Sequence, residues 1–100
     1  METFRHVVRS HGRVRANFNA PDINERSVVI ITAAEITRIG DNPHHRFLGD
    51  ADVWVSNIAP HGPPSDPNNG VEYILHIDWP EDIDVLVDIT LLDSPVVFDS

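Results

Sequence analysis

Hydrophobic and polar residues alternate with a period of two along most of this chain, and no segment keeps a helical period over three turns. Residues 13–19, for example, place Val14, Ala16 and Phe18 on one face of a strand and arginine or asparagine on the other. Further strands are expected at residues 27–39, 46–58, 71–79 and 83–91, with an additional one at 3–9. The sequence therefore predicts an all-β protein, a small antiparallel β-sandwich of five or six strands, with a β-barrel as the alternative.

Turn-forming residues separate these segments. Residues 19–22 and 40–43 each combine proline with side chains that hydrogen-bond to nearby backbone, which favours turns. Residues 59–70, APHGPPSDPNNG, hold four prolines and are predicted to be a loop rather than a strand interior. The run of apolar residues at 28–31 predicts a central strand covered on both faces. We expect one domain over residues 1–100, with 1–12 as an N-terminal arm or edge strand and 94–100 as a tail.

The last two predicted strands have the clearest alternation, and only Pro80-Glu81-Asp82 separates them. A three-residue loop of this kind predicts a hairpin whose apolar side chains share one face. A slip of one residue would invert every side chain, so the register is well specified. The expected pairs are Trp79 with Ile83, Ile77 with Val85, Leu75 with Val87 and Tyr73 with Ile89.

The charges are divided unequally along the chain. All seven arginines lie in residues 1–46 with five acidic residues, whereas residues 47–100 hold eleven acidic residues and no lysine or arginine. In one interpretation, N-terminal strands lie beside C-terminal ones and form cross-strand Arg–Asp pairs. In the other, the arginine-rich segment from Arg5 to Arg15 also docks on an acidic surface of a neighbouring subunit and helps to build a symmetric oligomer.

Composition excludes several classes of function. A net charge of −9 opposes binding to nucleic acid, which needs clustered cations, so we expect no nucleic-acid partner. No segment has the roughly 20 apolar residues of a membrane span, so we expect no membrane partner. The absence of cysteine makes the cytoplasm the default compartment, and secretion stays open. Without cysteine, lysine or a G-x-S-x-G motif, we expect the protein not to be an enzyme.

An acidic cluster is expected around the predicted hairpin. The register sets Asp78 opposite Asp84, with Glu81 and Asp82 in the loop and His76 and Asp88 close by. Opposed carboxylates need solvent, an arginine or a cation, and Ca²⁺ is the candidate cofactor because it binds several oxygen ligands. The spacing matches no recognised calcium loop, so the preferred interpretation has no metal and no cofactor. The six histidines likewise lack the spacing of a metal site.

Trp54 and Trp79 each lie where a strand meets a loop or a polar face. Either indole could belong to the core. An exposed tryptophan beside acidic residues is also a platform for a sugar ring, since the aromatic face packs on the CH groups of the ring and polar neighbours bind its hydroxyls. The candidate ligand-binding residues are Trp79, Asp78, Glu81, Asp82 and Asp84.

The order of features over residues 14–92 resembles the H-type lectin domain. The resemblance rests on residues 18–21 (FNAP) before the apolar residues 28–31, on a middle strand ending in residues 55–60 (VSNIAP), and on Gly70-Val71 opening the strand to Trp79. It implies a six-stranded antiparallel sandwich that forms trimers or hexamers and binds sugars such as N-acetylgalactosamine, with Trp79 as the sugar-contacting aromatic. The chain differs from the family at Pro80, where the family has a polar residue, and in having no cysteines.

Two hypotheses follow. The first is a non-catalytic binding module, most plausibly for carbohydrate, that acts as a homo-oligomer, a trimer or a hexamer. The alternative is a structural or assembly subunit whose arginine-rich N-terminus docks on a neighbouring acidic surface.

Overall fold

The computed structural model describes residues 1–39, 42–92 and 94–99, and over these residues it contains seven β-strands and no helix. The strands form a four-stranded sheet in the order β1-β7-β3-β4 and a three-stranded sheet in the order β2-β6-β5, and every pair is antiparallel. The all-β sandwich is therefore confirmed, with one strand more than the upper expected number. The strands are β1 (Glu2–Ser10), β2 (Gly12–Asn19), β3 (Val29–Ile39), β4 (Asn42–Arg46), β5 (Asp52–His61), β6 (Gly70–Asp78) and β7 (Ile83–Leu91).

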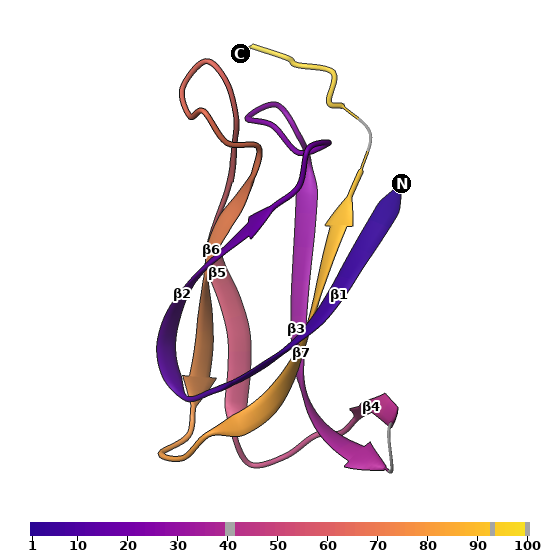
Figure 1. The fold of residues 1–100 in the computed structure, drawn as a ribbon, viewed down its shortest axis with the longest axis vertical. Coiled ribbons are helices and arrows are strands. Elements are labelled where there is room, and N and C mark those ends of the chain that lie inside the picture. The colour runs from indigo at the N-terminus through magenta and orange to yellow at the C-terminus, as the bar shows by residue number, and fades with distance from the viewer. Residues whose placement is uncertain (40–41, 93, 100) are drawn as a thin grey trace.

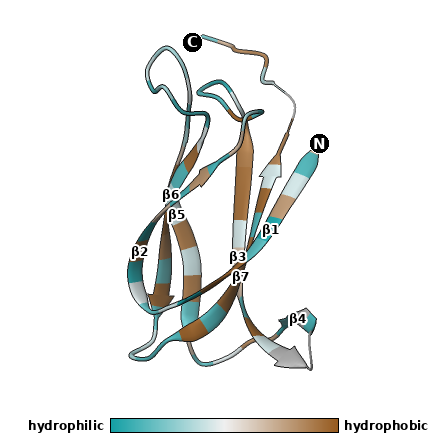
Figure 2. Ribbon diagram, viewed as in Figure 1, coloured by the Kyte–Doolittle hydropathy of each residue, from teal (hydrophilic) through white to brown (hydrophobic). Residues whose placement is uncertain are grey.

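The core lies between the two sheets, which form the two layers seen in Figure 1. Alternate residues of β6 and β7 supply most of it, and Figure 2 shows hydrophobic and hydrophilic positions alternating along the strands. Burying these side chains is the main source of stability, at roughly 1.5–3 kcal/mol for each large apolar group. The members from β6 and β7 that are at most 2% exposed are Val71, Tyr73, Leu75, Ile77, Val85, Val87 and Ile89.

The predicted hairpin of β6 and β7 is wrong, although the predicted faces of both strands are right. β6 pairs with β2 and β5, whereas β7 pairs with β1 and β3, so the two strands lie in opposite sheets. Residues 79–82 form an arch that carries the chain from one sheet to the other. The arch is favoured because the two apolar faces then cover one another across the core, whereas a hairpin would leave them side by side and in need of another layer.

The N-terminal segment also passes from one sheet to the other between consecutive strands. β1 is an edge strand of the four-stranded sheet, where Glu2 pairs with Leu91 and Ser10 with Ile83. The chain then crosses at Gly12, whose φ of 75° lies in the left-handed region that favours glycine, and continues as β2 in the other sheet. Of the two predictions for residues 1–12, the edge strand is thus the one observed.

β3 occupies the middle of its sheet as expected, but the outer face of its first residues is not covered. Ile30 points outward and is 49% exposed, because a two-layered sandwich has nothing outside the sheet at this position. The next predicted strand, 46–58, is also wrong as one element. β4 ends at Arg46 and β5 begins at Asp52, since the connecting residues carry the chain from the four-stranded to the three-stranded sheet. The predicted turn at 40–43 falls partly outside the described residues.

The first residues of the predicted 59–70 loop belong to β5, which extends to His61. Pro60 is tolerated there because β5 is at the edge of its sheet and needs no hydrogen bond on its outer side. A bulge between Ser56 and Ala59 bends the strand, with Asn57 at a φ of 55°. Described residues 94–99 form no strand. No helix in the described part of the chain is long and apolar enough to cross a membrane.

Candidate functional site

The arch separates the acidic residues that the sequence placed together. Asp78 ends β6 opposite Asp52 of β5, whereas Asp84 lies in the other sheet opposite Arg9 of β1. The predicted pairing of Asp78 with Asp84 is therefore wrong, because it depended on the hairpin. The calcium alternative depended on the same pairing. Among the described residues, no three His, Cys, Asp or Glu side chains lie close enough together to hold a metal ion.

The other acidic residues of the predicted cluster have separate surroundings. Asp82 in the arch lies 2.6 Å from Nδ1 of His11, and Glu81 is exposed. Asp84 Oδ1 lies 3.4 Å from Nη1 of Arg9. These contacts tie the arch and the start of β7 to the end of β1. Of the five candidate residues, Asp78 and Trp79 line a common hollow.

Asp88 is the centre of charge on the outer face of the four-stranded sheet. Arg5 donates to both of its carboxylate oxygens, at 2.7 and 2.8 Å, and Arg46 of β4 donates at 2.9 Å. The hydrogen bonds from Arg5, aided by the positive charge of Arg46, hold the pKa of Asp88 below its ordinary 3.8. His44 adds a contact of 3.1 Å to Arg5. The cross-strand Arg–Asp pairs expected from the charge distribution are thus present.

An aromatic stack lies on the outer face of the three-stranded sheet. Trp54 of β5 is the cross-strand partner of His76 of β6, and their rings are parallel within 4° with centroids 4.5 Å apart. Ser56, further along β5, fixes the imidazole through a 2.7 Å contact with Nε2. One face of the indole is therefore occupied by a held imidazole, yet Trp54 remains 47% exposed. The sequence had left open whether Trp54 is core or surface, and it is surface.

This stack borders a hollow of about 380 Å³ at the end of the three-stranded sheet. Trp79, 38% exposed, lies on another side of it, and Gly12 opens the wall because no atom lies within 4 Å of where its Cβ would be. A volume of this size is typical of sites for small ligands. We refer to this space as the tryptophan hollow. Its lining residues are Gly12, Arg13, Trp54, His76, Ile77, Asp78 and Trp79.

Trp79 also lines a second hollow of about 410 Å³ on its other side. The walls of that hollow include Phe47 and Leu48 of the β4–β5 connection, which are 40% and 101% exposed, and the acidic residues Glu35 and Asp50. Trp79 is therefore shared by two adjacent concave surfaces. A ligand longer than one ring could contact both.

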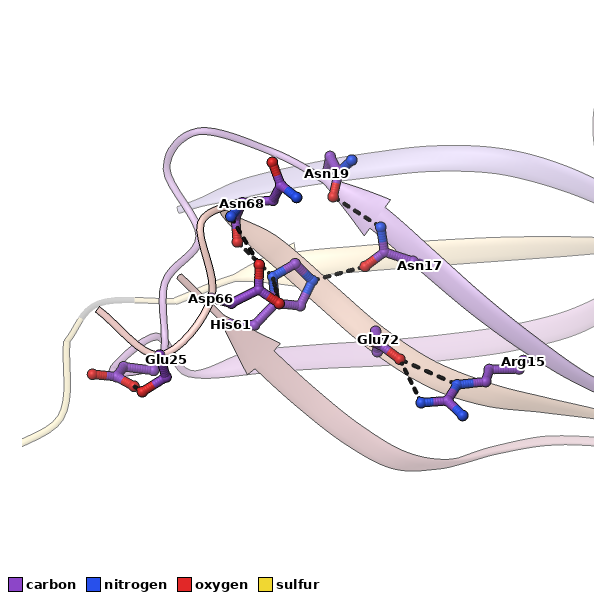
Figure 3. Close-up of polar contacts among 9 residues, drawn as sticks. Arg15, Asn17, Asn19, Glu25, His61, Asp66, Asn68 and Glu72 are labelled. Atoms are coloured by element: carbon purple, nitrogen blue, oxygen red, sulfur yellow. Dashed lines mark hydrogen bonds and ion pairs between the residues drawn. The ribbon is translucent and has the colours of Figure 1, made fainter. Parts of the chain in front are cut away.

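A separate polar cluster surrounds His61, the last residue of β5 (Figure 3). His61 pairs with Gly70 at the start of β6, the opposite end of that strand from Trp79. Its Nδ1 donates to the carbonyl of Asn68 at 2.7 Å, and its Nε2 lies 2.7 Å from Oδ1 of Asn17. Asp66 lies 3.8 Å from Nδ1. Both ring nitrogens are engaged within the protein, so the cluster anchors the 62–69 loop to β2 rather than offering free groups to a ligand.

One titratable pair is enclosed between the sheets. Nε2 of His6 lies 3.1 Å from the hydroxyl of Tyr73, and the imidazole stacks on Phe18 with centroids 5.9 Å apart. Burial lowers the pKa of His6 from its usual 6.5 and raises that of Tyr73. His6 Nδ1 is buried without a hydrogen-bond partner among the described residues. Neither His6 nor Tyr73 lines the tryptophan hollow.

Sequence reasoning missed Gly12, Arg13 and the role of His76 in the hollow. The alternation of residues 13–19 already placed Arg13 on the polar face of its strand. What the sequence lacked was the register that sets Arg13 beside His76, and His76 in turn beside Trp54. The chain matches no protein-family model, no curated protein and no solved structure.

Proposed function

We propose that this protein is a non-catalytic carbohydrate-binding module whose ligand occupies the tryptophan hollow. The observation that carries the proposal is that both tryptophans of the chain line this one hollow while keeping 47% and 38% of their surfaces exposed. A single exposed indole is common on protein surfaces and needs no explanation. Two indoles beside one concavity form an apolar surface of the kind that ligands cover.

The chemistry around the indoles suits a sugar. A pyranose has an apolar side, made of CH groups, and a rim of hydroxyls. Trp54 offers its exposed surface to the apolar side, Asp78 offers acceptors for hydroxyl hydrogens, and Arg13 offers donors for hydroxyl oxygens. His76 holds Trp54 in place by stacking on it, which limits the side-chain entropy lost on binding.

The absence of catalysis remains part of the proposal. Among the described residues that line the tryptophan hollow, Asp78 supplies the one carboxylate. Cleavage of a glycosidic bond ordinarily uses two, placed on either side of the bond. The hollow therefore has the surfaces for binding without the usual pair for hydrolysis.

The homo-oligomer, a trimer or a hexamer, also remains a proposal. An open site with a few polar contacts binds a sugar weakly, and several copies in one assembly would multiply that affinity through avidity. The alternative, an assembly subunit, requires N-terminal arginines that are free to dock on a neighbour. It is weakened because Arg5, Arg9 and Arg15 already contact Asp88, Asp84 and Glu72 of the same chain. Light scattering at low and high salt measures the subunit number directly.

Intrinsic fluorescence gives a direct test of the site, because both fluorescent indoles line the hollow. We expect a glycan array to show binding, and the sugars that bind to change the emission on titration. Trp54→Ala should weaken binding about tenfold or more while leaving the circular dichroism spectrum unchanged. Phe98→Ala is the matched control, because Phe98 is an exposed aromatic residue of the tail, 89% accessible. A silent array, or a Trp54→Ala variant that binds as tightly as the parent, would contradict the proposal.

A further inference from the structure

The arginines of this protein differ in whether a carboxylate is within reach. Arg5, Arg9, Arg15 and Arg46 each lie between 2.7 and 3.4 Å from an acidic side chain of the same chain. Among the arginine side chains that the structure describes, Arg13 and Arg26 are those without an ion pair. With sixteen acidic residues against seven arginines, a shortage of acids is not the reason.

Arg13 is unpaired because of its register. Its cross-strand neighbour on β6 is His76, and the nearest outward-facing acidic residue toward the start of that strand, Glu72, is held by Arg15 at 3.1 and 3.2 Å. Arg13 lines the tryptophan hollow and also a smaller hollow beside it, of about 220 Å³, that includes Asn57 and Ala59. The free guanidinium thus stands at the border of two concave surfaces.

Arg13, His76 and Trp54 form one row across the three strands of this sheet, since each is the cross-strand partner of the next. The row places a cation at one end and an aromatic platform at the other. Asp78, two residues beyond His76 on the same face, supplies hydroxyl acceptors on the side away from Glu72. A ligand that satisfied the whole row would have a ring for Trp54, hydroxyls for Asp78 and an anionic group for Arg13.

We infer that the ligand is an acidic sugar, one whose carboxylate is bound by Arg13. This inference rests on the proposed carbohydrate-binding function and adds the chemical class of the sugar, a uronic or sialic acid residue. The guanidinium presents parallel N–H groups that match the two oxygens of a carboxylate, which is why arginine rather than lysine suits this contact. Asp78 then sets the orientation of the sugar, because it would repel the sugar carboxylate and accept hydrogen bonds from the hydroxyls.

The test compares neutral glycans with acidic counterparts printed on one array. Sialyllactose adds an acidic residue to lactose, and glucuronic acid oligomers differ from glucose oligomers by their carboxylates. We expect signals on the acidic members, with an affinity about tenfold above that for the neutral members in a fluorescence titration. Arg13→Gln should remove the preference. Arg26→Gln removes the same charge from the other unpaired arginine, on the β2–β3 connection, and should leave the preference intact.

Arg13→Lys separates charge from geometry, and we expect it to recover only part of the preference because lysine lacks the planar fork. Circular dichroism of each variant establishes that it is folded. Equal or stronger binding of neutral glycans, or a preference that survives Arg13→Gln, would overturn this inference. The proposed function would stand in that case if Trp54→Ala still abolished binding. An array silent for neutral and acidic glycans alike would overturn both.

Discussion

The outer faces of the two sheets differ in how their arginines are paired with carboxylates. On the four-stranded sheet, Arg5 and Arg46 converge on Asp88, and β4, which pairs with β3, also contacts β7. On the three-stranded sheet, Arg15 pairs with Glu72, whereas Arg13 lies opposite His76 and has no acidic partner among the described residues. Arg5 and Arg13 belong to one short N-terminal segment, yet they lie on different sheets. Register, rather than composition, therefore decides which face is closed on itself and which is left open to a ligand.

Removing the apolar residue beneath the closed face should have the largest effect. Leu86 points outward between Val7 of β1 and Ala34 of β3, yet it is only 2% exposed. Leu86→Ala is expected to lower the free energy of unfolding by about 3 kcal/mol, because it leaves a cavity under the arginines. Urea denaturation measures this loss. Leu48→Ala, at a fully exposed leucine, should change stability by less than about 0.5 kcal/mol. Similar values for both variants would show that the face is not packed.

Neutralising the central carboxylate should have an intermediate effect. Asp88→Asn removes the charge that Arg5 and Arg46 share, and we expect a loss of roughly 1–2 kcal/mol, shrinking at high salt. The counterpart on the open sheet is Asp78→Asn. It should be neutral within about 0.5 kcal/mol or slightly stabilising, because Asp78 faces Asp52. Equal losses of unfolding free energy in Asp88→Asn and Asp78→Asn would show that the two faces do not differ in this way.

The smallest effect is expected on the pH dependence of stability. His6 has a lowered pKa when folded, so in mild acid the unfolded chain binds more protons than the folded one. Stability should therefore be complete above about pH 6.5 and decline as the pH falls below it. Asp88, also lowered, adds a second decline below about pH 3.8. Thermal melts from about pH 7.5 to 5.5 isolate the histidine.

A variant of His6 tests this assignment. His6→Gln should flatten the pH dependence of the melting temperature between these limits. An unchanged slope in His6→Gln would mean that His6 is not the group responsible.

Local alternation was enough to predict the inner faces of β2, β6 and β7, since burial on one side forces a period of two. It could not distinguish a hairpin from an arch. With Pro80-Glu81-Asp82 as the connection, both arrangements bury Leu75 and Val87, one side by side and the other face to face. The choice depends on the strands that flank them, β2 and β5 on one side and β1 and β3 on the other, which the sequence does not pair explicitly.

The candidate site was predicted in part for the same reason. Trp79 and Asp78 follow from their position at the end of one strand. Arg13 and Trp54 reach the hollow from the two strands on either side of His76, and they lie 41 positions apart in the sequence. Such a juxtaposition depends on two registers at once, and no local pattern encodes either.

The strand order also constrains how this sheet is made in the cell. Among the described strands, β7 is the last along the chain, and it alone joins β1 to β3. At a synthesis rate of roughly 5–20 residues per second, β1 is made several seconds before β7, the strand that pairs with it. A nascent chain lacking residues 83–91 would therefore leave β1 without a partner and β3 paired with β4 alone, and a chaperone bound at that stage would find its target in β1 and the open side of β3.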